Sequence, residues 1–261
     1  MGDESYKTLL AHGVKVAGAG IGAVVQGIIS PSGSDSMAST VLGAALAQGC
    51  VGVLDDLAHR FMSTKEKERV GGVAALAISE IKEDLLFNEP RTDGFFEESD
   101  GGPSPAEEVF EGVLIAAKQE HEQQKLPFIA SFYAKLVFYP HVSKAQANFL
   151  LNVIESLTYR QLAILALIEQ QSSFKLRDKR WEVNEERHPN SHSITMEALD
   201  LYQRQLIVSF NIDAGRAENV YEPGLVIPSR SMTSGVGITL CHLMGLHKIP
   251  HKELKNIAAE W

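Results

Sequence analysis

The sequence predicts a mainly α-helical protein: a helical bundle with a Gly/Ala-rich apolar helical hairpin, followed by a small winged-helix-like C-terminal unit. Three observations predict this class. Helix-capping patterns recur at short intervals through the middle of the chain. The apolar residues between them follow helical spacing. Strand-like runs of apolar residues are found only after Leu206, where they alternate with helical segments.

The first predicted element is an apolar helical hairpin over residues 13–54. From Val16 to Leu54 the only formal charge is Asp35, which lies in a turn rich in Ser, Gly and Pro at 30–36. The flanking segments, 8–29 and 37–54, have lengths that suit helices better than strands. An αα-hairpin is therefore the simplest connection.

Small residues recur four apart in this hairpin, a spacing that lets two helix backbones approach closely. The residues expected at a membrane or oligomer interface are Gly18, Gly22, Gly27, Gly43 and Gly49. The length of each arm favours a membrane span, whereas the scarcity of large aliphatic side chains makes insertion marginal. Three interpretations stay open: a hairpin buried in a soluble domain, a membrane-active hairpin, and an oligomer interface.

Four capping patterns mark the helices that follow. They are Ser63 with Glu66, Ser104 with Pro105 and Glu107, Ser143 with Gln146, and Thr158 with Gln161. The acidic segment between the first two helices is a loop by composition, and its adjacent Phe95 and Phe96 are expected to fold back onto the core. The predicted organisation is a hairpin plus amphipathic helix at 1–88, an acidic loop at 89–105, a helical region at 106–157 and a winged-helix-like region at 158–261.

The winged-helix-like region is predicted from the order of its elements. A helix at 195–206 runs into the strand-like segment 207–212, a second short apolar run follows at 225–228, and a helix over 233–245 closes the unit. The helix at 195–206 carries Glu197 and Asp200, which would repel phosphates. The candidate for nucleic-acid contact is therefore a basic cluster in the preceding insert. It consists of Lys175, Arg177, Lys179 and Arg180. The alternative interpretation is that these residues form a solvated loop.

The charge balance limits the partners. A net charge of −9 argues against a general polyanion binder, because phosphate contacts need a concentrated basic face. Residues 1–157 hold 12 Lys and Arg against 21 Asp and Glu, whereas residues 158–261 hold 12 against 12. A second copy of the chain, a membrane or a protein is therefore a more favoured partner than nucleic acid.

The expected location is cytoplasmic, with membrane association through the hairpin. Cys50 and Cys241 lie far apart in apolar runs, which indicates reduced, buried thiols. The acidic N-terminal residues lack the basic region of a secretion signal.

Motifs for catalysis or metal binding are weak. Glu185, His188 and His192 have helical metal-ligand spacing, but Pro189 interrupts it. Arg187 with His192 matches the R-x4-H pattern of HEPN-type ribonucleases, in which the pattern begins a helix, whereas here it falls in a polar insert. A P-loop, a nucleophile elbow, a dinucleotide fingerprint and zinc-finger spacing are all missing from the sequence. We assign no catalytic residue, no metal and no cofactor.

The order of three stretches carries a resemblance. EGVLIAAKQEHEQQKLP, SKAQANFLLNVIESLTYRQLAILALI and the closing LCHLMGLHKIP resemble a group of uncharacterised bacterial helical proteins. They are also similar to the abortive-infection alpha type of phage-defence protein, in which a Gly/Ala-rich helical part precedes a small winged-helix-like end. The resemblance implies a role in antiviral defence through membrane damage, and no functional residue is carried over from it.

The sequence thus favours a non-enzymatic helical effector of bacterial anti-phage defence that acts on a membrane or through oligomerisation of its hairpin. A winged-helix nucleic-acid-binding regulator or adaptor is the first alternative. An R-x4-H ribonuclease is the second.

Overall fold

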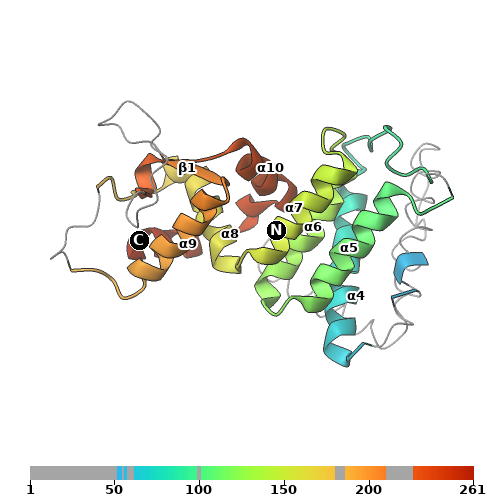
Figure 1. The fold of residues 1–261 in the computed structure, drawn as a ribbon, viewed down its shortest axis with the longest axis horizontal. Coiled ribbons are helices and arrows are strands. Elements are labelled where there is room, and N and C mark those ends of the chain that lie inside the picture. Colours follow the sequence, from blue (N-terminus) through green and yellow to red (C-terminus); the bar gives the residue numbers. More distant parts are fainter. Residues whose placement is uncertain (1–51, 55, 58–61, 99–100, 180–185, 210–225) are drawn as a thin grey trace. The chain divides into compact units, whose positions relative to one another are not determined.

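The fold is mainly helical, as the sequence predicts (Figure 1). The computed structural model describes residues 52–54, 56–57, 62–98, 101–179, 186–209 and 226–261. These residues belong to two compact units, which divide between Ser156 and Leu157. Each unit is described by itself below.

Unit 1 is a bundle of α-helices. Its elements are α4 (Thr64–Asp84), α5 (Pro105–Gln119), the short 3-10 helix η1 (Gln123–Lys125), α6 (Leu126–Leu136) and α7 (Lys144–Ser156). The central helix is α6, in which every residue except Lys135 is buried. Helix α4 packs mainly against α6 and also against α5, and α5 packs in turn against α7. The rings of Phe110 and Tyr133 meet in this core with their centroids 4.6 Å apart.

The predicted capping boxes of unit 1 are confirmed. Ser63 and Ser104 each accept a hydrogen bond from the backbone N–H three residues later, and the glutamates at those positions accept in return from the cap N–H. Ser143 and Gln146 form the same reciprocal pair before α7. Helix α6 ends at Leu136, after which the chain makes turns towards Pro140.

The acidic loop between α4 and α5 is held against unit 1 by a buried arginine. Arg91 is 4% exposed, its backbone N–H donates to the carbonyl of Val137 at 2.9 Å, and its guanidinium forms two hydrogen bonds with Asp93, at 2.7 and 2.5 Å. The guanidinium lies 4.1 Å from the ring centroid of Phe95, which is buried as expected, whereas Phe96 is only half-buried. The loop therefore joins helices of one unit, since α4 before it packs against α5 and α6 after it.

Unit 2 is built around α8 (Tyr159–Glu169), whose residues from Leu162 to Ile168 are all buried. A helix that is apolar on every side needs partners all round. The surrounding elements are η2 (Gln171–Ser173), α9 (Ser191–Gln203), β1 (Ile207–Ser209), η3 (Pro228–Arg230), β2 (Ser231–Thr233), α10 (Gly235–Met244), η4 (Leu246–Lys248) and α11 (His251–Glu260). Of these, α9, α10, α11, η4 and β2 pack directly on α8.

The two strands of unit 2 pair antiparallel, with Ile207 opposite Thr233 and Ser209 opposite Ser231. The first strand begins where the sequence predicts it. The prediction for the second was wrong: the apolar run 225–228 leads into a 3-10 turn at Pro228, and the pairing residues come three positions later. Helix α9 begins at Ser191 and ends at Gln203, earlier than the expected 195–206.

In the part of the chain that the structure describes, no single helix is both long and apolar enough to cross a bilayer. Helices α7 and α8 reach that length and composition only when taken together across the break between them.

Candidate functional site

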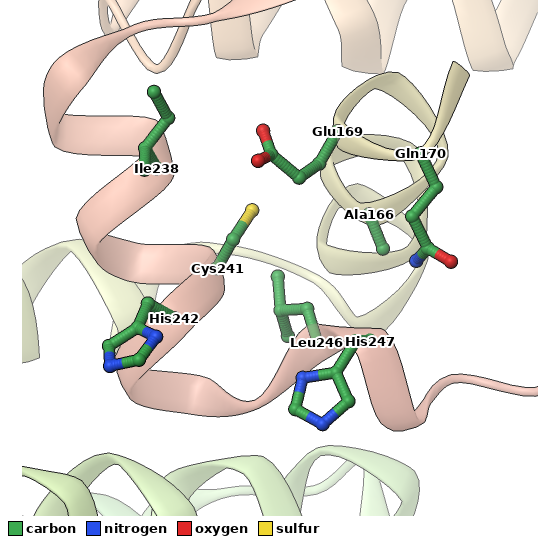
Figure 2. A pocket seen from close by; sticks show the side chains of 8 residues that line it. All are labelled: Ala166, Glu169, Gln170, Ile238, Cys241, His242, Leu246 and His247. Carbon is green, nitrogen blue, oxygen red and sulfur yellow. The ribbon is translucent and has the colours of Figure 1, made fainter. Parts of the chain in front are cut away.

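A surface pocket of about 250 Å³ lies in unit 2, between α8, α10 and η4 (Figure 2). We call it the unit 2 pocket. Helices α8 and α10 contribute most of its walls, and the short helix η4 closes one end. The residues that line it are Ala166, Glu169, Gln170, Ile238, Cys241, His242, Leu246 and His247.

The end of α10 shapes this pocket. Gly245 adopts the left-handed conformation with φ 63°, which ends α10 and turns the chain into η4. Residues with a Cβ rarely adopt this conformation, so glycine suits the position. The turn places Leu246, which is fully buried, and His247, which is exposed, on the pocket wall opposite α8.

The side chains of Glu169 and Cys241 point toward one another across the pocket (Figure 2). The hydroxyl of Thr233 donates a hydrogen bond to one carboxylate oxygen of Glu169. Burial raises the pKa of the Cys241 thiol well above its usual value, and the nearby negative charge of Glu169 raises it further. Because the thiolate is the reactive form of cysteine, Cys241 is a poor nucleophile at neutral pH.

The histidines of the pocket do not join Glu169 and Cys241 in a metal centre. His242 and His247 are exposed and lie away from the Glu169 carboxylate (Figure 2). Across the described ranges, no group of three His, Cys, Asp or Glu side chains could hold a metal ion. Of the residues with predicted metal-ligand spacing, His188 and His192 are exposed on either side of the start of α9, and Glu185 lies outside the described residues.

The predicted basic cluster lies beside the short helix η3. Lys175 and Lys179 are exposed, Arg177 is half-buried, and Arg180 lies outside the described residues. The backbone carbonyl of Arg177 accepts a hydrogen bond of 3.1 Å from the N–H of Ser229. This contact brings Arg230, which sequence reasoning did not include, next to the basic segment.

The acidic residues of α9 are neutralised by neighbouring side chains. Glu197 receives two hydrogen bonds from Arg160 at the start of α8, at 2.8 and 2.6 Å. Asp200 accepts from Gln161 at 2.7 Å and from Arg204 at 2.8 Å. The expected repulsion of phosphates by this helix is therefore weaker than the sequence suggests, because both carboxylates already have partners of opposite charge or donor groups.

The R-x4-H pair has a different setting from the one expected. His192 is the second residue of α9, so the pattern does lead into a helix. Arg187 precedes that helix in an irregular segment, and both side chains are exposed.

The residues expected at a membrane or oligomer interface lie outside the described residues, as does Cys50. They are Gly18, Gly22, Gly27, Gly43 and Gly49. Cys241 is a free, buried thiol, as the sequence predicts.

Sequence reasoning missed the unit 2 pocket. Its acid and its thiol are 72 positions apart in the chain, and neither belongs to a recognisable motif. Comparison of the chain with protein-family models, curated proteins and solved structures gives no significant match.

Proposed function

We propose that this chain is a non-enzymatic helical effector that acts on a membrane, or through self-assembly, by way of its Gly/Ala-rich segment 13–54. The observation that carries the proposal is the near absence of charge from Val16 to Leu54, where Asp35 is the only charged residue. Glycines spaced four apart in the same segment favour close contact between helices in lipid or in an oligomer.

The burial of apolar side chains in the described helices supports this proposal. The apolar side chains of α6 and α8 are enclosed by other helices of their own units. In this proposal, membrane contact is made by the segment 13–54. The two helical units then serve as the soluble body of the effector.

The chemistry of the unit 2 pocket argues against a cysteine nucleophile there. Its thiol is held in the protonated form by burial and by the adjacent carboxylate, which is the opposite of what nucleophilic catalysis requires. The resemblance to phage-defence proteins adds the setting: a bacterial effector that stays in the cytoplasm until infection releases it or drives its oligomerisation.

The test is dye release from liposomes that contain anionic lipid, with the full chain added as purified protein. We expect leakage, and co-sedimentation of the protein with lipid. Replacing Gly22 or Gly43 by leucine is expected to abolish leakage, because a large side chain prevents close helix contact. Gly235→Leu is the matched control, since Gly235 begins α10 with open space around it. The proposal fails if no oligomeric state of the protein releases dye or sediments with lipid.

A second candidate is a winged-helix-like nucleic-acid-binding adaptor. It is supported by the order α8, α9, β1, β2, α10 and by the basic segment beside Arg230. Duplex DNA or RNA should then bind at low salt, and Lys175→Glu with Lys179→Glu should weaken binding and flatten its salt dependence. Undetectable binding at low salt would exclude this candidate.

The R-x4-H ribonuclease is favoured by one observation, the exposed His192 in the first turn of α9. It predicts cleavage of single-stranded RNA that disappears in His192→Ala. Cleavage that persists in this variant would come from a contaminant and would exclude the assignment.

A further inference from the structure

We propose that the unit 2 pocket binds a small organic cation, with one ammonium group held by the carboxylate of Glu169 and an apolar part lying against α10. This inference is independent of the proposed action on membranes. It rests on the charge, the geometry and the size of the pocket.

The charge of the pocket comes from one side chain. Among the lining residues Glu169 is the only acid, and none of them is a lysine or an arginine. Glu169 is itself exposed at the rim of the pocket, so its carboxylate alone holds a cation weakly, and the apolar walls must supply the rest of the binding energy. The pocket therefore selects ammonium groups over neutral or anionic groups of the same shape.

The carboxylate is oriented for this contact. Thr233, from β2, donates its hydroxyl to one oxygen of Glu169 and so restrains the side chain. An ionised carboxylate has about four acceptor positions, so this single bond leaves capacity for the N–H groups of a ligand. Figure 2 shows the carboxylate turned into the space between α8 and α10.

The size and the walls of the pocket define the rest of the ligand. A volume of about 250 Å³ is below the 300–1,000 Å³ of pockets for drug-sized molecules, so we expect roughly six to ten non-hydrogen atoms. The walls opposite Glu169 include the apolar side chains of Ile238, which is 49% exposed, and Leu246. A short alkyl chain attached to the ammonium group would cover these side chains.

The test uses three probes of equal length: hexylammonium, 1-hexanol and hexanoate. Binding to the full chain is measured by saturation-transfer NMR and by the shift of the thermal midpoint. We expect hexylammonium to bind with a dissociation constant on the order of 1 mM, which suits a ligand of this size, and the other two probes several-fold more weakly or not at all. Equal binding of hexanol, or no binding of hexylammonium, would overturn the proposal.

Two variants locate the site. Glu169→Gln keeps an oxygen that can accept from Thr233, and it should weaken hexylammonium binding several-fold. Glu186→Gln, at an equally exposed acid outside the pocket, should leave binding unchanged. Gln170→Glu places a second carboxylate at the pocket and should tighten binding several-fold, a gain that misfolding cannot imitate. Undiminished binding by Glu169→Gln, or no gain in Gln170→Glu, would show that the cation binds elsewhere.

Discussion

Gly237, in the first turn of α10, packs directly against the backbone of Leu206, which precedes β1. A Cβ at this position would lie 2.1 Å from the carbonyl oxygen of Leu206 and 3.1 Å from its carbonyl carbon. The same oxygen accepts a hydrogen bond from the N–H of Ser234, the N-cap of α10. A backbone atom held in this way cannot move aside as the end of a flexible side chain could.

We expect Gly237→Ala to lower the free energy of unfolding by about 3 kcal/mol, although alanine is ordinarily the better helix former. Urea denaturation followed by circular dichroism measures the effect. Gly235→Ala is the matched control, because a Cβ at Gly235, which starts the same helix, would meet nothing within 4 Å. If both variants had the same stability as the parent protein, the close contact with Leu206 would be wrong.

Gln205 has a backbone conformation that is unfavourable for its residue type. Its φ is 58°, and its N–H donates to the carbonyl of Tyr202 at the end of α9. Gln205→Gly should raise the free energy of unfolding by about 0.5–1 kcal/mol, because glycine adopts this conformation without steric cost. Gln203→Gly, two residues earlier within α9, should have the opposite sign. A loss of stability in Gln205→Gly would contradict the assigned conformation.

At the scale of single residues, the sequence predicts what depends on near neighbours. The capping boxes at Ser63, Ser104 and Thr158 follow from residues three positions apart, and all three are present. The constraint on Gly237 depends on Leu206, which is 31 positions earlier in the sequence. No local pattern records such a contact, and the pairing of Glu169 with Cys241 was missed for the same reason.

At the scale of elements, a buried ion pair joins α5 to the start of α6. The ammonium nitrogen of Lys125 lies 2.7 Å from a carboxylate oxygen of Glu120, and their side chains are 2% and 6% exposed. Burial alone would raise the pKa of Glu120, but the hydrogen bonds from Lys125 and from the N–H of Glu122 outweigh it, so the pKa lies below its ordinary value. Lys125 also donates to the backbone carbonyl of Glu155 in α7, at 3.3 Å.

The lowered pKa of Glu120 fixes the sign of its pH dependence. The folded state binds this proton less readily than the unfolded state, so the contribution to stability is present above the ordinary pKa of 4.5 and is lost as the pH falls through the lower folded value. Lys125→Met should cost about 3–5 kcal/mol at pH 7, because it leaves a carboxylate buried without its cation.

The deficit of Lys125→Met should shrink as the pH falls from 7 towards 4.5, because Glu120 buried without its cation takes up a proton more readily than it does in the unfolded chain. Urea denaturation at pH 7 and near pH 4.5 measures this. The double variant Lys125→Met with Glu120→Leu should recover most of the loss at pH 7, since no charge is then buried. A deficit that stayed constant with pH would mean that Lys125 acts through packing alone.

Of the two strands, the first could be predicted from the sequence and the second could not. Ile207 to Ser209 reads as a strand because β-branched and apolar residues follow the end of α9. Its partner, Ser231–Thr233, is three residues long and contains Ser, Met and Thr, so it carries no apolar pattern of its own. The sequence therefore favours the apolar run before it as the second strand. In the structure, Val226 and Ile227 of that run are buried without entering the sheet.

At the scale of the whole molecule, the mainly helical class was predictable because it sums many local signals. The partners of each helix were not. The described residues 88–98 and 101–104 form a loop, as their composition predicts, but α4 before this loop packs against α5 and α6 after it. An amphipathic pattern shows that a helix has a face to bury and does not show which helix covers it. The partners of α4 therefore had to come from the structure.

The division between Ser156 and Leu157 leads to the last prediction. Helix α8 is enclosed by α9, α10, α11, η4 and β2, all of which follow it in the chain, so unit 2 contains the partners for its own apolar centre. A fragment of residues 157–261 should therefore unfold cooperatively in urea, with the helical circular dichroism of a folded domain. A shorter fragment that begins after Glu169 lacks α8 and should be unfolded.

Gly237→Ala should destabilise the 157–261 fragment by the same amount as the full chain, because its contact with Leu206 lies within the unit. A fragment without a cooperative transition, or a variant whose effect appears only in the full chain, would mean that unit 2 depends on residues before 157 for its core.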